Sequence, residues 1–179
     1  MIPTCYICAR ADSHQVYLQR RGAGSIYIQE HAGSMHMTYE VNIGALPPVH
    51  KSKIYNLMQT CFPDKYVADL HKYSSGVVHQ RDGMFVGMLT LSEQVAEGRN
   101  ELHVENLCVH PRYRKRGIGA EMLAYVAESK GSDHTIALYV NHTPSRSHEL
   151  LINWYERQQY RVERQNENET LLTLNYRKL

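Results

Sequence analysis

Two glycines, Gly117 and Gly119, follow three consecutive basic residues, 114–116, and this segment constrains the fold more than any other. An apolar, strand-like run precedes it, and a run with helical periodicity follows it. Because glycine has no Cβ atom, the backbone here can approach a ligand closely. The first N–H groups of a helix have no intrahelical acceptor and carry partial positive charge. Residues 114–120, the 114–120 loop, are therefore suited to bind an anion such as a pyrophosphate.

Two common phosphate-binding loops are excluded by the residues around the glycines. A Walker A loop needs Lys followed by Ser or Thr after its second glycine, and neither pair follows Gly119. A dinucleotide fingerprint needs a third glycine where this chain has Met122. The remaining pattern is Arg-x-x-Gly-x-Gly, preceded at 107–111 by Leu-Cys-Val-His-Pro. The alternative is a basic loop that only caps a helix.

The Arg-x-x-Gly-x-Gly pattern and the residues before it resemble the coenzyme A loop of the GNAT superfamily of N-acetyltransferases. The resemblance runs from residue 39 to the C-terminus and is most specific over 101–129. It implies that backbone N–H groups hold the coenzyme pyrophosphate, with Arg114 and Lys115 as charge partners. It also implies that the strand before the loop pairs with the pantetheine arm and polarises the thioester carbonyl. The implied coenzyme-binding residues are Leu107, Cys108, Val109, Arg114, Lys115, Arg116, Gly117, Ile118, Gly119 and Ala120.

Hydrophobic periodicity predicts the other elements of the chain. Ile54, Leu57 and Met58 lie on one face of a predicted helix over 51–61, and Asp82 followed by Gly83 is typical of a hairpin turn. The predicted elements are a strand over 37–42, the helix over 51–61, a short helix from Pro63 with Val67 and Leu70 inward, strands over 76–80 and 84–90, a polar loop over 93–100, a strand over 102–109, a helix with Ile118, Met122 and Val126 on one face, a strand over 136–140, a helix over 147–158 with Leu150, Leu151 and Trp154 inward, and a hairpin of 161–164 and 170–176.

This order of elements is the layout of the GNAT acyl-CoA N-acyltransferase fold. That fold is α/β (α+β), with a mixed, largely antiparallel sheet and helices on both faces. We expect it over residues 37–179. Residues 1–36 are expected to form a small N-terminal β-hairpin extension, in which strands over 16–18 and 26–28 flank a glycine-containing turn.

The N-terminal extension also carries a candidate metal site. Cys5 and Cys8 form a C-x2-C pair, and His31 and His36 follow the predicted hairpin. Two thiolates and two imidazoles can supply the four tetrahedral ligands of a structural zinc. The 22 residues between the pairs exceed the usual finger spacing. The alternative is that the cysteines are small buried side chains and the histidines are surface residues.

Three residues are candidates for proton transfer. His103 and Glu105 would share one face of the predicted 102–109 strand, together with Leu107 and Val109, and a neutral imidazole is suited to act as a base near pH 7. The arylalkylamine N-acetyltransferases, which this segment resembles, carry two histidines at the places of His103 and Glu105. Glu105 would then orient His103 or bind a cationic substrate.

The segment Trp-Tyr-Glu-Arg at 154–157 resembles the Phe-Tyr-Glu-Arg segment of the superfamily, whose tyrosine commonly protonates the coenzyme A thiolate. The resemblance implies this role for Tyr155. The alternatives are packing of Tyr155 beside Trp154 and solvent exposure of His103 and Glu105.

Composition narrows the remaining classes of function. Twenty Lys and Arg against 18 Asp and Glu give a net charge of +2, so nothing indicates nucleic acid or an anionic membrane as the main partner. No apolar run is long enough to span a membrane. Cys61 and Cys108 lie in apolar surroundings, as reduced core residues do, so we expect an intracellular, cytoplasmic protein.

The sequence therefore predicts an N-acetyltransferase that uses acetyl-CoA as co-substrate, with a primary amine as acceptor. A small amine, an arylalkylamine or a polyamine, is favoured by the resemblance at His103. A peptide or protein amine is one alternative. A non-catalytic acyl-CoA-binding module, with the zinc knuckle as its interaction element, is another. The monomer and the homodimer both remain open.

Overall fold

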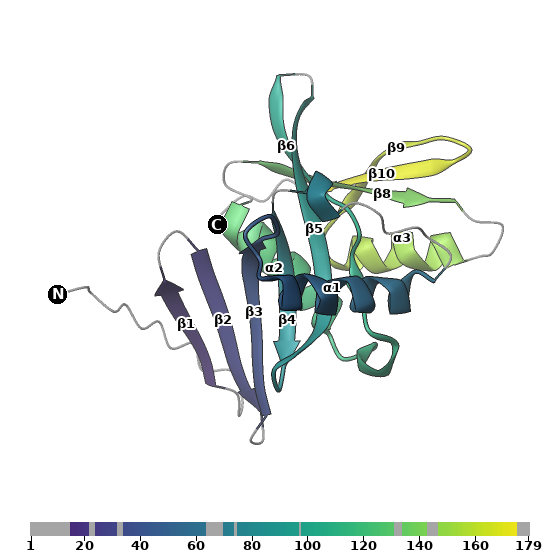
Figure 1. Cartoon of the computed structure of the whole chain (residues 1–179). Helices are drawn as coiled ribbons and strands as arrows, with labels where there is room; N and C mark the ends of the chain where they lie inside the picture. The colour runs from purple at the N-terminus through teal and green to yellow at the C-terminus, as the bar shows by residue number, and fades with distance from the viewer. Residues whose placement is uncertain are drawn as a thin grey trace. The chain divides into compact units, whose positions relative to one another are not determined.

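A computed structural model describes residues 15–21, 24–31, 34–63, 70–73, 75–96, 98–130, 134–142 and 147–174 of the chain (Figure 1). The chain divides into two compact units, which are described separately. Unit 1 comprises residues 1–90 and 106–125, and unit 2 comprises 91–105 and 126–179.

Unit 1 contains an antiparallel sheet whose strands follow the order β1-β2-β3-β4-β5, with the short β7 paired to β5. Figure 1 shows β1 to β4 side by side, with α1 lying across this unit. The elements are β1 (Gln15–Arg21), β2 (Gly24–His31), β3 (Ser34–Asn42), α1 (Pro48–Cys61), η1 (Leu70–Lys72), β4 (Ser75–Arg81), the start of β5 (Met84–Ala96), β7 (Cys108–Val109), η2 (Pro111–Tyr113) and the start of α2 (Ile118–Lys130).

The two helices α1 and α2 cover opposite faces of the unit 1 sheet. Ile54 and Met58 of α1 are buried in one cluster with Val78 of β4. The next residue of β4, His79, contacts Glu121 of α2. Because successive residues of a strand point to opposite faces, the helices must lie on different sides. The expected arrangement of helices on both faces is therefore confirmed within this unit.

Unit 2 contains the end of β5 followed by the order β6-β8-β10-β9. β6 and β8 are parallel, whereas the other described pairs of this unit are antiparallel. The predicted fold class, a mixed and mostly antiparallel sheet with helices, is confirmed. The elements are β6 (Arg99–Val104), β8 (Thr135–Asn141), α3 (Ser147–Arg157), β9 (Arg161–Gln165) and β10 (Glu169–Leu174).

The predicted continuous strand over 102–109 is wrong, because it is interrupted at 105–107. β6 ends at Val104, and β7 begins at Cys108 and pairs with β5. Within unit 1, the Asn106 amide donates to the Tyr73 hydroxyl and to Thr90 Oγ1, both at 3.1 Å. These side-chain bonds hold the break in the strand. The shared face predicted for residues 103–109 depended on an unbroken strand.

Two other local predictions are corrected. Residues 93–100 are not a loop throughout, since β5 reaches Ala96 and β6 starts at Arg99. In α3, Leu150 and Leu151 are 69% and 46% exposed, and the buried residue of the helix is Tyr155. Trp154, the third residue predicted to face inward, is half-buried against Tyr155, so the prediction is wrong for the two leucines.

The N-terminal hairpin is present, and it continues into the core sheet. β1 pairs with β2 with Arg21 opposite Gly24, β2 pairs with β3, and β3 pairs with β4. β3 starts at Ser34, so it crosses the expected boundary between residues 36 and 37. Cys5, Cys8 and Val67 lie outside the described residues. None of the described helices is long and apolar enough to cross a membrane.

Candidate active site

The 114–120 loop connects η2 to α2, and its own residues determine its backbone conformation. Lys115 and Gly117 have φ angles of 60° and 80°, in the left-handed region where glycine is the least strained residue. The first backbone hydrogen bond of α2 runs from the Glu121 N–H to the Gly117 carbonyl at 2.9 Å. The N–H groups of residues 118–120 therefore have no intrahelical acceptor. The loop presents the helix N-terminus that an anion site requires.

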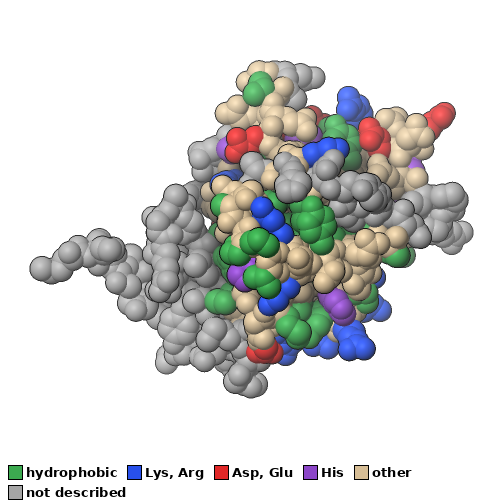
Figure 2. Space-filling model, viewed as in Figure 1, with side chains coloured by type: hydrophobic (Ala, Val, Ile, Leu, Met, Phe, Trp, Pro, Cys, Tyr) green, Lys and Arg blue, Asp and Glu red, His purple; other side chains and the backbone are tan. Residues whose placement is uncertain are grey.

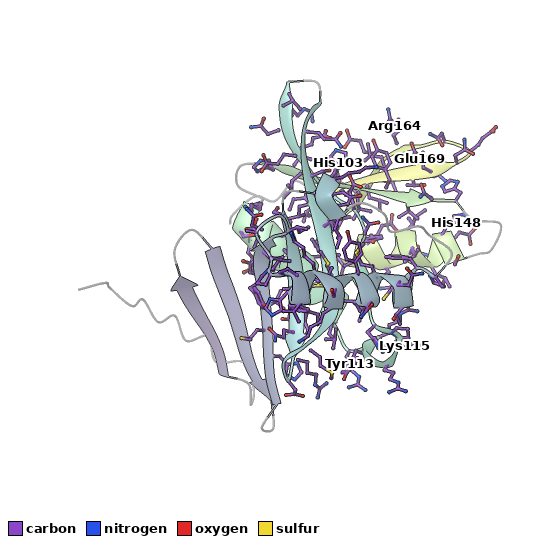
Figure 3. All side chains as sticks on the ribbon, in the orientation of Figure 1. His103, Tyr113, Lys115, His148, Arg164 and Glu169 are labelled. Atoms are coloured by element: carbon purple, nitrogen blue, oxygen red, sulfur yellow. The ribbon has the colours of Figure 1, made fainter. Side chains whose placement is uncertain are left out.

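Basic side chains surround this helix start. Arg112, Lys115 and Arg116 are exposed, and Ile118 behind them is buried. The Arg116 guanidinium lies over the Tyr113 ring at 5.4 Å from its centroid. Figure 3 shows Tyr113 and Lys115 together at one end of unit 1, and Figure 2 shows Lys and Arg side chains along that edge. The loop thus combines free N–H groups with positive charge.

The outer edge of β7 presents the backbone of Val109. The N–H of the next residue, His110, donates to the Val86 carbonyl of β5 at 2.9 Å. Since alternate residues of a strand direct their backbone groups to opposite sides, the N–H and carbonyl of Val109 point away from β5. Arg114 Nε donates to that carbonyl at 3.0 Å. The Arg114 side chain is thus tied to β7 as well as carrying positive charge.

A buried polar cluster under the first turn of α2 was not identified from the sequence. The Thr38 hydroxyl donates to Glu121 Oε1 and contacts His79 Nδ1 at 2.8 Å. His79 Nδ1 lies 3.4 Å from the same carboxylate oxygen. Burial opposes ionisation, but the bonds from His79 and Thr38 hold the pKa of Glu121 below its ordinary value of 4.5. The cluster ties α2 to β3 and β4 directly behind the loop.

In unit 2, His103 is paired with a carboxylate other than the one expected. His103 is only 5% exposed, and its Nε2 lies 2.8 Å from Glu101 Oε2. Its ring stacks on Tyr139 with centroids 5.7 Å apart. Glu105 is exposed and accepts a hydrogen bond from Ser92 Oγ at 2.8 Å. Glu101 is therefore the carboxylate that contacts His103, and Glu105 bonds Ser92. The Glu-x-His spacing in a strand is the signal that could have identified Glu101, because residues two apart share a face.

Tyr155 is buried in the last turns of α3, within an aromatic group. Its ring packs edge-on against Trp154 and Tyr160, with centroid distances of 4.8 and 5.9 Å. Burial raises the pKa of Tyr155 to about 12. The phenol is therefore protonated at neutral pH and can serve only as a proton donor there. The predicted packing beside Trp154 is present, and it is compatible with that chemistry.

The structure assembles the predicted residues in two groups. The coenzyme-loop residues and those of β7 belong to unit 1, whereas His103, Glu105 and Tyr155 belong to unit 2. Among the residues that the structure describes, no group of three or more His, Cys, Asp or Glu side chains could hold a metal ion. Since Cys5 and Cys8 lie outside those residues, the zinc site stays a prediction.

The family follows from the sequence and agrees with this geometry. Residues 72–162, just over half of the chain, match the family model described as Acetyltransferase (GNAT) domain. The chain therefore belongs to the GNAT acetyltransferase family and is an acyltransferase. The match includes β7, the 114–120 loop and α2. No curated protein matches the chain.

Solved structures share the fold at low sequence identity. Arabidopsis thaliana Naa50, bound to the bisubstrate analogue CoA-Ac-MVNAL, is 15% identical with a TM-score of 0.60, covering 76% of this chain and 97% of that one. Arabidopsis thaliana NAA60 with acetyl-CoA is 16% identical with a TM-score of 0.60, covering 76% and 98%. The PaiA N-acetyltransferase of Thermoplasma acidophilum with coenzyme A is 13% identical with a TM-score of 0.56, covering 78% and 99%. These comparisons do not show the resemblance to arylalkylamine N-acetyltransferases.

Proposed function

We propose that the chain is an acetyl-CoA-dependent N-acetyltransferase that acts on a small primary amine by direct attack. The observation that carries the proposal is the 114–120 loop, a basic helix N-terminus inside the matched GNAT domain. The N–H groups of 118–120 would bind the coenzyme pyrophosphate, with Lys115 and Arg116 supplying charge. The outward N–H of Val109 would bind the pantetheine arm or the thioester carbonyl.

The chemistry needs a base for the amine and an acid for the thiolate. The amine nitrogen attacks the thioester carbon, the tetrahedral intermediate collapses, and the C–S bond breaks. We assign proton removal to His103, which Glu101 holds by its Nε2. We assign protonation of the departing thiolate to Tyr155, which burial keeps in the neutral form. These roles come from the family resemblance, and the observed burial and pairing support them.

The acceptor class is argued from the charges beside His103. Glu101 and Glu105 flank it in sequence, and Glu101 shares its face of β6. Two carboxylates near the proposed base favour an acceptor that is cationic before it loses a proton, such as an arylalkylamine or a polyamine. Peptide amines are the competing class, since the analogue bound to Naa50 carries the peptide sequence MVNAL.

The test is thiol release from acetyl-CoA against matched amines. The panel contains arylalkylamines, polyamines, free amino acids, lysine peptides and peptides with free N-termini. Stimulation by arylalkylamines or polyamines supports the proposal. Stimulation by peptides alone would mean that the acceptor is a peptide or protein amine and not a small amine. If acetyl-CoA binds but no amine stimulates release, the chain is a coenzyme-binding module or acts on a protein that the panel lacks.

A structural zinc in the N-terminal extension remains a separate proposal. The β2–β3 register pairs His31 with Ser34 and Gln29 with His36, so the two histidine backbones lie near the same end of one hairpin. Cys5 and Cys8 would complete the ligands. Metal analysis of the purified chain tests this, and a stoichiometric zinc that is lost in Cys5→Ser is the expected result. Absence of zinc from a protein purified without chelators would reject the site.

A further inference from the structure

Two cysteines meet beside the coenzyme loop in unit 1. Cys61 is the last residue of α1, and Cys108 is the first residue of β7, on which α1 packs. Cys61 packs against the buried cluster that contains Cys108, and a side-chain hydrogen bond links the two thiols. Cys108 is 4% exposed, whereas Cys61 is only partly buried. A reagent can therefore reach the partly exposed Cys61, whereas Cys108 is buried.

The pair is polarised by its surroundings. The hydrogen bond from Cys108 lowers the pKa of Cys61, burial opposes this, and the bond and charge of Arg114 lower it further, to about 7. The same hydrogen bond and burial raise the pKa of Cys108. Cys61 is thus the thiolate of the pair and Cys108 the thiol donor. A partly exposed thiolate beside a guanidinium is the environment in which cysteines react.

We propose that Cys61 is an oxidative modification site, at which a peroxide attacks first and Cys108 then closes a disulfide. The Cys61 sulfur attacks one peroxide oxygen, the O–O bond breaks, and a sulfenic acid forms. The Cys108 sulfur then attacks the Cys61 sulfur, the S–O bond breaks, and water leaves with the Cys108 proton. With hydrogen peroxide, two thiols lose two electrons and two protons, and the peroxide becomes two molecules of water.

Formation of the disulfide requires a local movement of one cysteine. A disulfide is about 2.05 Å long, so the two hydrogen-bonded sulfurs must approach each other. Cys61 lies where α1 ends, and the capping residue Phe62 has left helical geometry, with φ and ψ of −132° and 66°. A movement at Cys61 therefore affects the last helical bonds, such as that from the Phe62 N–H to the Met58 carbonyl at 2.8 Å, and leaves the earlier turns of α1 in place.

Oxidation also removes a partner of Arg114. In the reduced protein, its guanidinium bonds the Cys61 sulfur, and its Nε donates to the Val109 carbonyl. A disulfide sulfur is neutral and accepts hydrogen bonds weakly, so Arg114 loses its charged anchor at the start of the 114–120 loop. This consequence rests on the proposed function, and we expect the Kd for acetyl-CoA to rise about fivefold on oxidation.

The experiment is limited treatment of the full-length protein with hydrogen peroxide, followed by peptide mapping without reduction. We expect a peptide that joins Cys61 to Cys108, and its loss after treatment with dithiothreitol. A folded protein, judged by circular dichroism, in which Cys61 stays a thiol or stops at the sulfinic acid overturns the proposal. Cross-links from Cys5 or Cys8 map to other peptides and do not confuse the result.

Two variants serve as matched controls. In Cys61→Ser, Cys108 should stay reduced under the same treatment. In Cys108→Ser, Cys61 should proceed to the sulfinic acid, since no second thiol resolves the sulfenic acid. Oxidation of Cys108 in Cys61→Ser at the rate of the parent protein overturns the assigned order.

Acetyl-CoA titration of the reduced and oxidised parent protein tests the consequence separately. A reduced protein that binds no acetyl-CoA contradicts the proposed function and leaves the mapped disulfide valid. A Kd that does not change on oxidation overturns the linkage through Arg114.

Discussion

The 114–120 loop differs from the surroundings of His103 and Tyr155 in the groups that it offers, because the loop presents backbone N–H groups and the other region presents buried side chains. The loop exposes backbone N–H groups, and its conformation includes Lys115 and Gly117 at positive φ. His103 and Tyr155 are buried side chains, and their chemistry depends on neighbours such as Glu101 and Tyr160. An anion site can therefore be built from local backbone, whereas an acid or a base must be tuned by packing.

The two regions should also respond differently to substitution. A change in the loop alters backbone preference and should affect coenzyme affinity first. A change at His103 or Tyr155 alters a proton path and should affect kcat first. The variants below test whether effects on affinity and on kcat separate in this way.

Tyr155→Phe should show the largest effect. Removing the proposed proton donor is expected to lower kcat about 100-fold, since general acid catalysis contributes on the order of that factor. The Kd for acetyl-CoA, measured by titration calorimetry, should stay within about twofold. Tyr160→Phe is the matched control, because the Tyr160 hydroxyl is also buried and finds no hydrogen-bond partner among the residues that the structure describes. An equal loss of kcat in both variants would reduce Tyr155 to a packing residue.

Glu101→Gln should lower kcat about tenfold and leave the coenzyme Kd unchanged. The amide can still pair with His103, but it lacks the charge that stabilises the imidazolium formed when His103 takes a proton. Steady-state rates with saturating amine measure the effect. Glu93→Gln is the control on the same hairpin, because Glu93 pairs with Leu102 and so lies on the opposite face. A matching decrease in Glu93→Gln would point to net charge and not to the pair.

Gly117→Ala should raise the coenzyme Kd about fivefold with little change in kcat, since an L-residue in left-handed geometry costs about 1 kcal/mol. Gly83→Ala is the control, because Gly83 has a φ of 78° in the β4–β5 turn. At either glycine an added Cβ would meet nothing within 4 Å. Both variants should lose similar free energy of unfolding, and only Gly117→Ala should weaken binding. Equal Kd changes would mean that strain anywhere in unit 1 disturbs the site.

Glu121→Gln should have the smallest effect, a loss of about 1 kcal/mol in the free energy of unfolding near pH 7. The pKa of Glu121 is lower in the folded protein than its ordinary value of 4.5. Its carboxylate therefore stabilises the fold fully above pH 4.5, and this contribution disappears as the pH falls through the folded pKa. Urea unfolding of both proteins from pH 7 to pH 3 should show the difference closing in acid. If the difference in free energy of unfolding between the two proteins does not change with pH, the loss in Glu121→Gln comes from altered packing and not from the carboxylate charge.

Elements whose conformation depends on neighbouring residues could be predicted from the amino-acid sequence. Asp82 and Gly83 adopt φ angles of 48° and 78°, as the Asp-Gly hairpin signal predicts. The helix after the loop buries Ile118, Met122 and Val126, as its periodicity predicts. Backbone preference and hydrophobic spacing act between residues a few positions apart, so one sequence suffices to find them.

Contacts between side chains that are distant in the sequence became known only from the folded structure. Asn106 breaks the strand predicted over 102–109 through bonds to Tyr73 and Thr90, which lie 33 and 16 residues away. Thr38 reaches Glu121 across 83 residues. Such contacts arise when separate elements are packed, and no local pattern encodes the distance between two atoms. The helix start at the 114–120 loop could therefore be predicted from the sequence, whereas the partners of His103, Arg114 and Cys61 required the folded chain.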